Sequence, residues 1–197
     1  MAKRERFDTL CIITNNAALL WKNARGIAPD DVADKMDIAM LDWQSSLTQT
    51  LRIWIEKGLS MSNGELILAR ANLGAVVESW LKFFYCVFYD QYSVNPKTDR
   101  SGRSIEPENL KFEDLKNFST GKLWNSAASP EYLWVDSVQH KRNAIHSFKF
   151  KDIGTPQEFL DDIDKLYDFV DNVYSHFPPL EDYIAIYPSD YQNPYFY

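Results

Sequence analysis

The sequence predicts an all-α protein, an antiparallel bundle of five to six helices, and three observations support this. Long segments place apolar residues at steps of three and four, the period of an amphipathic helix, and none reads as a convincing strand. Seven glycines in 197 residues are few, which argues against turn-dense β architectures and glycine-rich phosphate loops. Aromatic residues make up 15% of the chain and can supply a substantial core.

The first third of the chain predicts two helices. One covers about residues 7–24. The next opens at Pro29 with Asp30 and Asp31, residue types that suit an N-cap and a first turn, and it ends at Gly58, a residue typical of the position just past a helix. We expect one continuous helix there, with an apolar face made of Val32, Met36, Met40, Trp43, Leu47, Leu51 and Trp54.

A further long helix is expected from Asn63, whose side chain can cap it, to about residue 92. Beyond Trp80 this segment is apolar nearly all round, so its C-terminal half should be buried on several sides. Its main apolar stripe consists of Leu66, Leu73, Val77, Trp80, Phe84 and Phe88.

The sequence of the second half of the chain predicts a polar loop and three helices. The loop covers residues 93–110 and a shorter helix follows in "FEDLKNFSTGKLW". The next helix begins with Ser129 as cap and Pro130 at its first position, and the last one repeats this pattern with Thr155 and Pro156. The last helix should bury Phe159, Ile163, Leu166, Val170 and Val173.

We interpret residues 1–177 as a single helical domain and residues 178–197 as a Pro/Tyr-rich, extended aromatic tail. Pro188 and Pro194 prevent one continuous helix in this tail. Two interpretations stay open: a strap packed on the bundle or on a partner subunit, or a binding segment for another protein.

The net charge and the cysteine content indicate which partners and which cellular compartment to expect. The formal net charge is −7 and the pI is near 5.0, so any nucleic-acid contact should be confined to one cleft. The two cysteines, Cys11 and Cys86, lie far apart and form no CxxC pair, which favours a reduced, cytoplasmic setting. Neither a signal peptide nor a membrane span is evident, so no membrane association is expected.

Most catalytic classes lack their motifs in this chain. The three histidines do not stand at metal-site spacings, and there is no Walker or dinucleotide loop, so we expect no metal and no cofactor. No GxSxG motif is present, and Cys86 lies in an apolar run where it should be buried and inert. Asp161, Asp162 and Asp164 fall early in the last helix, where we interpret them as a solvated face.

One constellation remains, in "KRNAIH" at residues 141–146. On an α-helix, Arg142 and His146 would project from one face, about 40° apart in azimuth and about 6 Å apart along the axis. The buried stripe of this helix should be Val135, Val138 and Ile145, with Arg142 falling between the last two. A buried arginine must pair inside the bundle or line a cleft. Glu78 in the second long helix is the candidate partner.

These residue types suit the cleavage of RNA without a metal. A guanidinium can bind a phosphate bidentately, and an imidazole can take a proton from a 2′-hydroxyl or give one to a leaving 5′-oxygen. Lys141, Lys149 and Lys151 add positive charge beside Arg142 and His146, which fits a confined phosphate-binding cleft.

An all-α bundle whose late helix carries Arg, a polar residue and then His resembles the HEPN superfamily (higher eukaryotes and prokaryotes nucleotide-binding domains). The matching residues are Arg142, Asn143 and His146 in "RNAIHSF". The resemblance implies a metal-independent endoribonuclease of toxin–antitoxin or phage-defence systems, acting as a homodimer with a cleft between subunits. Arg142 would then stabilise the phosphate, His146 would be the acid or base, and Asn143 would orient one of them.

Two functions follow from this resemblance. The first is the ribonuclease, with RNA as substrate and an antitoxin or other protein as a partner. The second is a noncatalytic HEPN-like module that binds protein or nucleotide, with Arg142 in a structural ion pair. The family pattern usually has a longer interval between Arg and His than the three residues Asn143, Ala144 and Ile145 found here.

Overall fold

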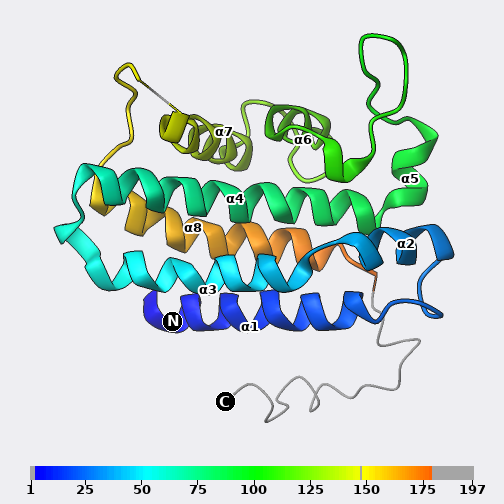
Figure 1. The fold of residues 1–197 in the computed structure, drawn as a ribbon, viewed down its shortest axis with the longest axis horizontal. Coiled ribbons are helices and arrows are strands. Elements are labelled where there is room, and N and C mark those ends of the chain that lie inside the picture. The colour runs from blue at the N-terminus through cyan, green and yellow to red at the C-terminus, as the bar shows by residue number, and fades with distance from the viewer. Residues whose placement is uncertain (1–2, 147, 179–197) are drawn as a thin grey trace.

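The computed structural model describes residues 3–146 and 148–178, and within these ranges the chain is helical and contains no β-strand (Figure 1). The predicted all-α class is therefore confirmed, whereas the aromatic tail beyond Pro178 lies outside the described residues. None of the described helices combines the length and apolar character needed to cross a bilayer. The described α-helices are α1 (Lys3–Lys22), α2 (Asp30–Ile38), α3 (Leu41–Lys57), α4 (Asn63–Val87), α5 (Tyr89–Val94), α6 (Phe112–Phe118), α7 (Pro130–Arg142) and α8 (Pro156–Ser175).

The helix count exceeds the predicted five to six because two expected helices are interrupted. The segment from Asp30 to Gly58 is not one helix: it breaks at Ala39 and Met40, where Ala39 adopts extended backbone with φ −73° and ψ 131°. Local propensity does not explain this break, since Ala and Met are good helix formers. The break separates α2, which contacts α5 as well as α1 and α4, from α3, which packs along α1 and α4.

The interruption also makes part of the predicted apolar face wrong. Val32, Met36 and Leu51 are buried, but Met40 is 51% exposed and Trp43 is 63% exposed. The predicted face assumed one continuous helix, but the helical phase is lost at the break. Met40 and Trp43 therefore do not lie on the buried face.

Helix α4 forms the centre of the bundle. Its N-cap is Ser62 and not the expected Asn63: the Ser62 side chain accepts a hydrogen bond from the Glu65 amide, and the Glu65 carboxylate accepts one from the Ser62 amide at 2.9 Å. The chain leaves helical geometry at Phe88 before α5 begins. The predicted burial of the C-terminal half of α4 is confirmed, with Trp80, Leu81, Phe83, Phe84, Tyr85, Cys86 and Val87 all buried.

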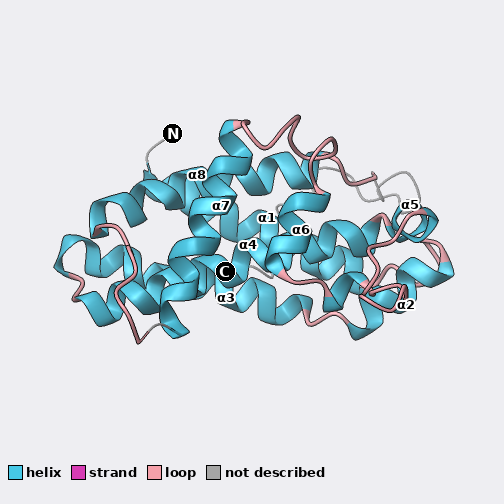
Figure 2. Cartoon of the chain, turned by 90° about the horizontal axis from the view of Figure 1, so that it is seen from above, coloured by secondary structure: helices cyan, strands magenta, loops and turns pink. Residues whose placement is uncertain are grey.

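The other helices surround α4 on several sides. Figure 1 shows α3 and α1 on one side of α4 and α7 and α6 on the other, and Figure 2 shows the same helices from above. Helix α8 contacts both α4 and α1. An aromatic cluster joins α1, α4 and the end of α8, because the ring of Phe177 lies 5.7 Å from Trp21 and 4.9 Å from Phe83, measured between centroids.

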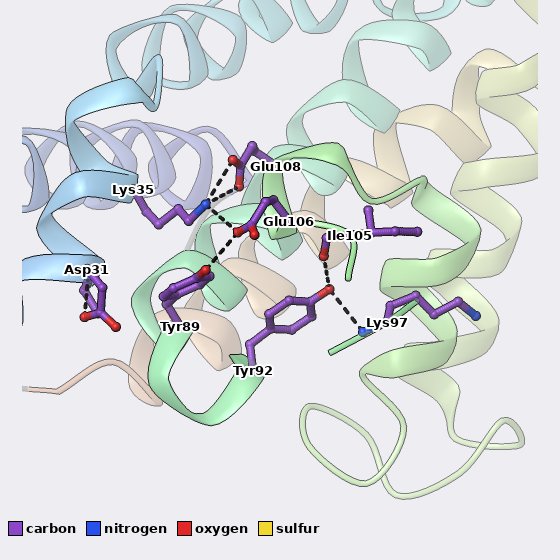
Figure 3. Close-up of polar contacts among 9 residues, drawn as sticks. Asp31, Lys35, Tyr89, Tyr92, Lys97, Ile105, Glu106 and Glu108 are labelled. Carbon is purple, nitrogen blue, oxygen red and sulfur yellow. Dashed lines mark hydrogen bonds and ion pairs between the residues drawn. The ribbon is translucent and has the colours of Figure 1, made fainter. Parts of the chain in front are cut away.

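The loop between α5 and α6 is fixed to α2 by a polar cluster (Figure 3). The Lys35 ammonium, on α2, donates to Glu106 at 2.6 Å and to Glu108 at 3.1 Å, and the Tyr89 hydroxyl donates to Glu106 at 3.0 Å. The hydrogen bond from Lys35 lowers the pKa of the Glu106 carboxyl below its ordinary value. The cluster therefore stabilises the position of this long loop with Glu106 ionised.

Helix α8 follows the prediction closely except at Asp162. Thr155 and Glu158 form a capping box, Pro156 takes the first position, and the five expected apolar residues are buried. Asp162, expected on the solvated face, is only 6% exposed. Its carboxylate accepts hydrogen bonds from Arg70 Nη1 at 2.5 Å and from Trp134 Nε1 at 3.0 Å, so it is a buried acceptor for groups on α4 and α7.

Arg70 also fixes the entry to α8. It is 1% exposed, and its Nε donates to the Ile153 carbonyl at 3.0 Å. The next residue, Gly154, has φ +69°, and a Cβ there would lie 2.3 Å from Glu158 Oε2 and 3.0 Å from Arg70 Nη2. Glycine is therefore required for both the backbone conformation and the close approach of these charged groups.

We expect Asp162→Ala to lower the free energy of unfolding by about 3–5 kcal/mol, because it leaves the Arg70 guanidinium buried without its carboxylate. Urea unfolding followed by circular dichroism measures this. Asp161→Ala is the matched control: this neighbouring side chain is exposed and should change stability by about 0.5 kcal/mol or less. Equal, small losses in both variants would contradict a structural role for the buried pair.

Candidate functional site

Helix α7 presents the predicted Arg-Asn-His motif at its C-terminal end. It begins at Pro130 as expected, with Ser129 at the N-cap position, but the Ser129 hydroxyl does not cap the helix and instead accepts from the Ser126 amide at 3.0 Å. Val135 and Val138 are buried against the bundle, as predicted. The helix ends at Arg142, and residues Asn143–His146 continue as a 3₁₀ turn.

This 3₁₀ turn corrects the expected placement of Ile145 and His146. Ile145 is 43% exposed instead of buried, and His146 is exposed. Each residue of a 3₁₀ helix turns by about 120°, so four steps rotate His146 by about 120° from Arg142, in place of the about 40° of an α-helix. The two side chains therefore do not project from a single helical face.

Arg142 lies in a close contact between α7 and α4. Its side chain packs over Gly74, where a Cβ would come within 2.4 Å of Arg142 Cγ and 2.5 Å of its Cβ. Its Nη2 donates to Glu78 Oε2 at 2.9 Å, which is the partner expected from the sequence, and its Nη1 donates to Asn143 Oδ1 at 3.2 Å. The Arg142 side chain keeps 31% of its surface exposed, so the guanidinium is held but not enclosed.

Glu78 is shared between two cations. Besides Arg142, it lies 3.3 Å from Lys82 Nζ, one turn further along α4, and its own side chain is 16% exposed. This half-buried network places the guanidinium at the surface with a fixed orientation. A fixed, partly solvated guanidinium can bind a phosphate or a carboxylate without first being ordered.

Of the two predicted substrate-binding lysines, Lys141 points away from Arg142. Lys141 points toward α8, with its Nζ 4.0 Å from Asp162 Oδ2, so it belongs to the buried Arg70–Asp162 network and is only 16% exposed. Lys149 lies in the segment that follows the 3₁₀ turn, where its side chain is exposed. The structure thus brings together Arg142, Asn143 and Glu78, and it separates Lys141 from them.

The two cysteines, which lie outside this site, are buried or partly buried. Cys86 is buried, as predicted, and burial raises the pKa of its thiol to about 12. Burial likewise raises the pKa of Cys11 to about 11. Within residues 3–146 and 148–178, no group of three or more His, Cys, Asp or Glu side chains is placed to hold a metal ion.

Two residues that shape the site were not identified from the sequence, although signals for both exist. Gly74 stands inside a long helical pattern, where a glycine often marks a close approach of another segment. Arg70 falls on the stripe of Leu66, Leu73 and Val77, so its helical phase alone indicates a buried charge that needs a partner.

Comparisons of this chain with protein-family models, with curated proteins and with solved structures found no match.

We expect Gly74→Ala to destabilise the protein by about 1–3 kcal/mol, because the added methyl group overlaps the inner part of the Arg142 side chain. Gly64→Ala, in the same helix, is the matched control: nothing lies within 4 Å of its Cβ position, and alanine is the better helix former. Chemical denaturation of both variants tests this. A Gly74→Ala protein as stable as Gly64→Ala would show that α7 does not depend on close approach at this glycine.

Proposed function

We propose that this chain is a HEPN-type metal-independent endoribonuclease, a toxin or phage-defence effector that cleaves RNA as a homodimer. The observation that supports the proposal is the half-exposed Arg142, oriented by Glu78 and Asn143 at the end of α7. The guanidinium has more N–H groups than these two contacts use, so it can bind a phosphate while it remains fixed.

In the proposed reaction, Arg142 binds the non-bridging oxygens of the scissile phosphate and stabilises the charge that develops on them. A general base removes the proton of the adjacent 2′-hydroxyl, and this oxygen attacks the phosphorus. The bond to the 5′-oxygen breaks, the leaving oxygen takes up a proton, and a 2′,3′-cyclic phosphate remains. His146 supplies one of the two proton transfers, and the copy of His146 in the second subunit supplies the other.

The test is cleavage of a mixture of single-stranded RNAs in EDTA by wild type, Arg142→Ala and His146→Ala. We expect each variant to lower the rate by about two orders of magnitude or more, because each removes one charge-stabilising or proton-transferring group. His140→Ala is the control, since His140 is an exposed histidine on the same helix and outside the proposed mechanism. Wild type and variants that leave the RNA equally intact would reject the activity.

The second candidate is a noncatalytic HEPN-like module that binds protein or nucleotide. It is favoured by the contacts of Arg142 with Glu78 and Gly74, which are those of a side chain that holds two helices together. The rotation of His146 away from Arg142 supports it as well.

For this second candidate, Arg142→Ala should lower the melting temperature by several degrees, because it leaves Glu78 with only Lys82 and removes the packing over Gly74. Arg103→Ala is the control, since that arginine pairs with Asp99 at an exposed position. Thermal unfolding followed by circular dichroism measures both. An Arg142→Ala protein that melts with wild type would contradict a structural role and favour a functional one.

A further inference from the structure

Two phenylalanines immediately after the Arg-Asn-His motif are fully exposed to solvent. The relative exposure of Phe148 is 105% and that of Phe150 is 94%. Every other phenylalanine that the structure describes is buried or partly buried. In Figure 1 this segment, drawn in yellow between α7 and α8, projects from the body of the bundle. Single exposed apolar residues are common, but neighbouring exposed aromatic side chains form an apolar patch, and such patches often mark interaction sites.

The surroundings of these rings in the sequence are basic, although the protein as a whole is acidic. Between Asp136 and Asp152 the chain contains no acidic residue. Lys141 and Arg142 in this stretch face Asp162 and Glu78, whereas Lys149 and Lys151 are exposed. The two phenylalanines alternate with the last two of these lysines. This local excess of positive charge in a chain of net charge −7 favours a ligand that is a polyanion.

The ligand must therefore offer flat apolar faces and regularly spaced negative charges along one line. A single-stranded nucleic acid has both, because each unpaired base can stack on an aromatic ring and each phosphate can approach a lysine. A duplex is a poorer fit, since its bases are already stacked on one another. An acidic protein surface would supply the charge but not a series of flat faces.

We propose that residues 148–151 form a stacking platform for single-stranded RNA, with Phe148 and Phe150 each stacking on a base and Lys149 and Lys151 approaching the phosphates. This inference rests on the proposed function and deepens it. Because the platform begins two residues after His146, bases held on it place the neighbouring phosphodiester near Arg142 and His146. The substrate class is then unpaired RNA, and paired RNA is discriminated against.

Binding can be measured separately from cleavage. The probe is a fluorescein-labelled single-stranded oligouridylate with 2′-O-methyl riboses, which lacks the attacking hydroxyl and cannot be cleaved by the proposed reaction. Fluorescence anisotropy gives the Kd for wild type and for the double variant Phe148→Ser/Phe150→Ser. We expect the Kd to rise at least about tenfold, because base stacking on an aromatic ring contributes about 1–3 kcal/mol per base.

The controls use other exposed positions and another form of the ligand. Leu59→Ser/Val94→Ser removes two exposed apolar side chains far from the motif in the sequence, and it should leave the Kd unchanged. Lys149→Gln/Lys151→Gln should weaken binding and lower its dependence on salt, since fewer counterions are then released. The same oligonucleotide annealed to its complement should bind more weakly than the single strand. Because the two rings make little contact with the bundle, the phenylalanine variant should have the same melting temperature as wild type.

The outcomes separate this inference from the proposed activity. Equal binding by wild type and the phenylalanine variant overturns the platform, whether or not RNA is cleaved. Failure of wild type to bind the oligonucleotide also overturns the platform. If the phenylalanine variant then changes its oligomeric state on gel filtration, the two rings belong to a contact between copies of this chain. Binding that depends on the two rings, without cleavage of ordinary RNA, supports the platform and rejects the ribonuclease.

Discussion

The Asp162 carboxylate is buried at the meeting point of three helices, and it receives the Arg70 guanidinium from α4 and the Trp134 indole from α7. A charge in this position is tolerated only when its partners are present with good geometry, so each of the three helices must occupy its native place at the same time. Arg70 also donates a hydrogen bond to the Ile153 carbonyl, which fixes the segment that leads into α8. The packing of α4, α7 and α8 thus depends on a polar cluster that is enclosed between them.

The end of α7 depends on a second constraint, the absence of a side chain at Gly74. It allows the stem of Arg142 to lie directly on α4, and Glu78, one turn further along, then receives the guanidinium. The same helix therefore supplies both the surface on which Arg142 rests and the charge that orients it. Past Arg142 the tighter 3₁₀ turn carries His146 to the exterior. Helix α4 thus fixes the arginine, whereas the position of the histidine follows from the local turn.

Most of the helices could be predicted from the sequence, because periodic apolar residues and terminal signals agree with each other. Helix α8 is the clearest case, with Thr155, Pro156 and the buried stripe all correct. The break between α2 and α3 could not be predicted, because Ala39 and Met40 are good helix formers and carry no local signal for an interruption. At the site, Glu78 was predicted as the partner of Arg142 from its place inside the second long helix, and the ion pair confirms it. The exposure of His146 was not predicted, since it depends on the turn that follows α7. The burial of Asp162 was missed although its helical phase, three residues after Phe159 and four before Leu166, places it on the buried stripe.

The chain between Arg142 and Ile153 is tied at both ends to α4, at Glu78 and at Arg70. These two residues are eight positions apart on one helix, which corresponds to about 12 Å along its axis. The connecting segment would span about 36 Å if fully extended, but the 3₁₀ turn at Asn143–His146 shortens this path. Two side chains of α4 therefore hold both ends of this segment. Both attachments come from the same helix, so a displacement of α4 would move the two ends of this segment together.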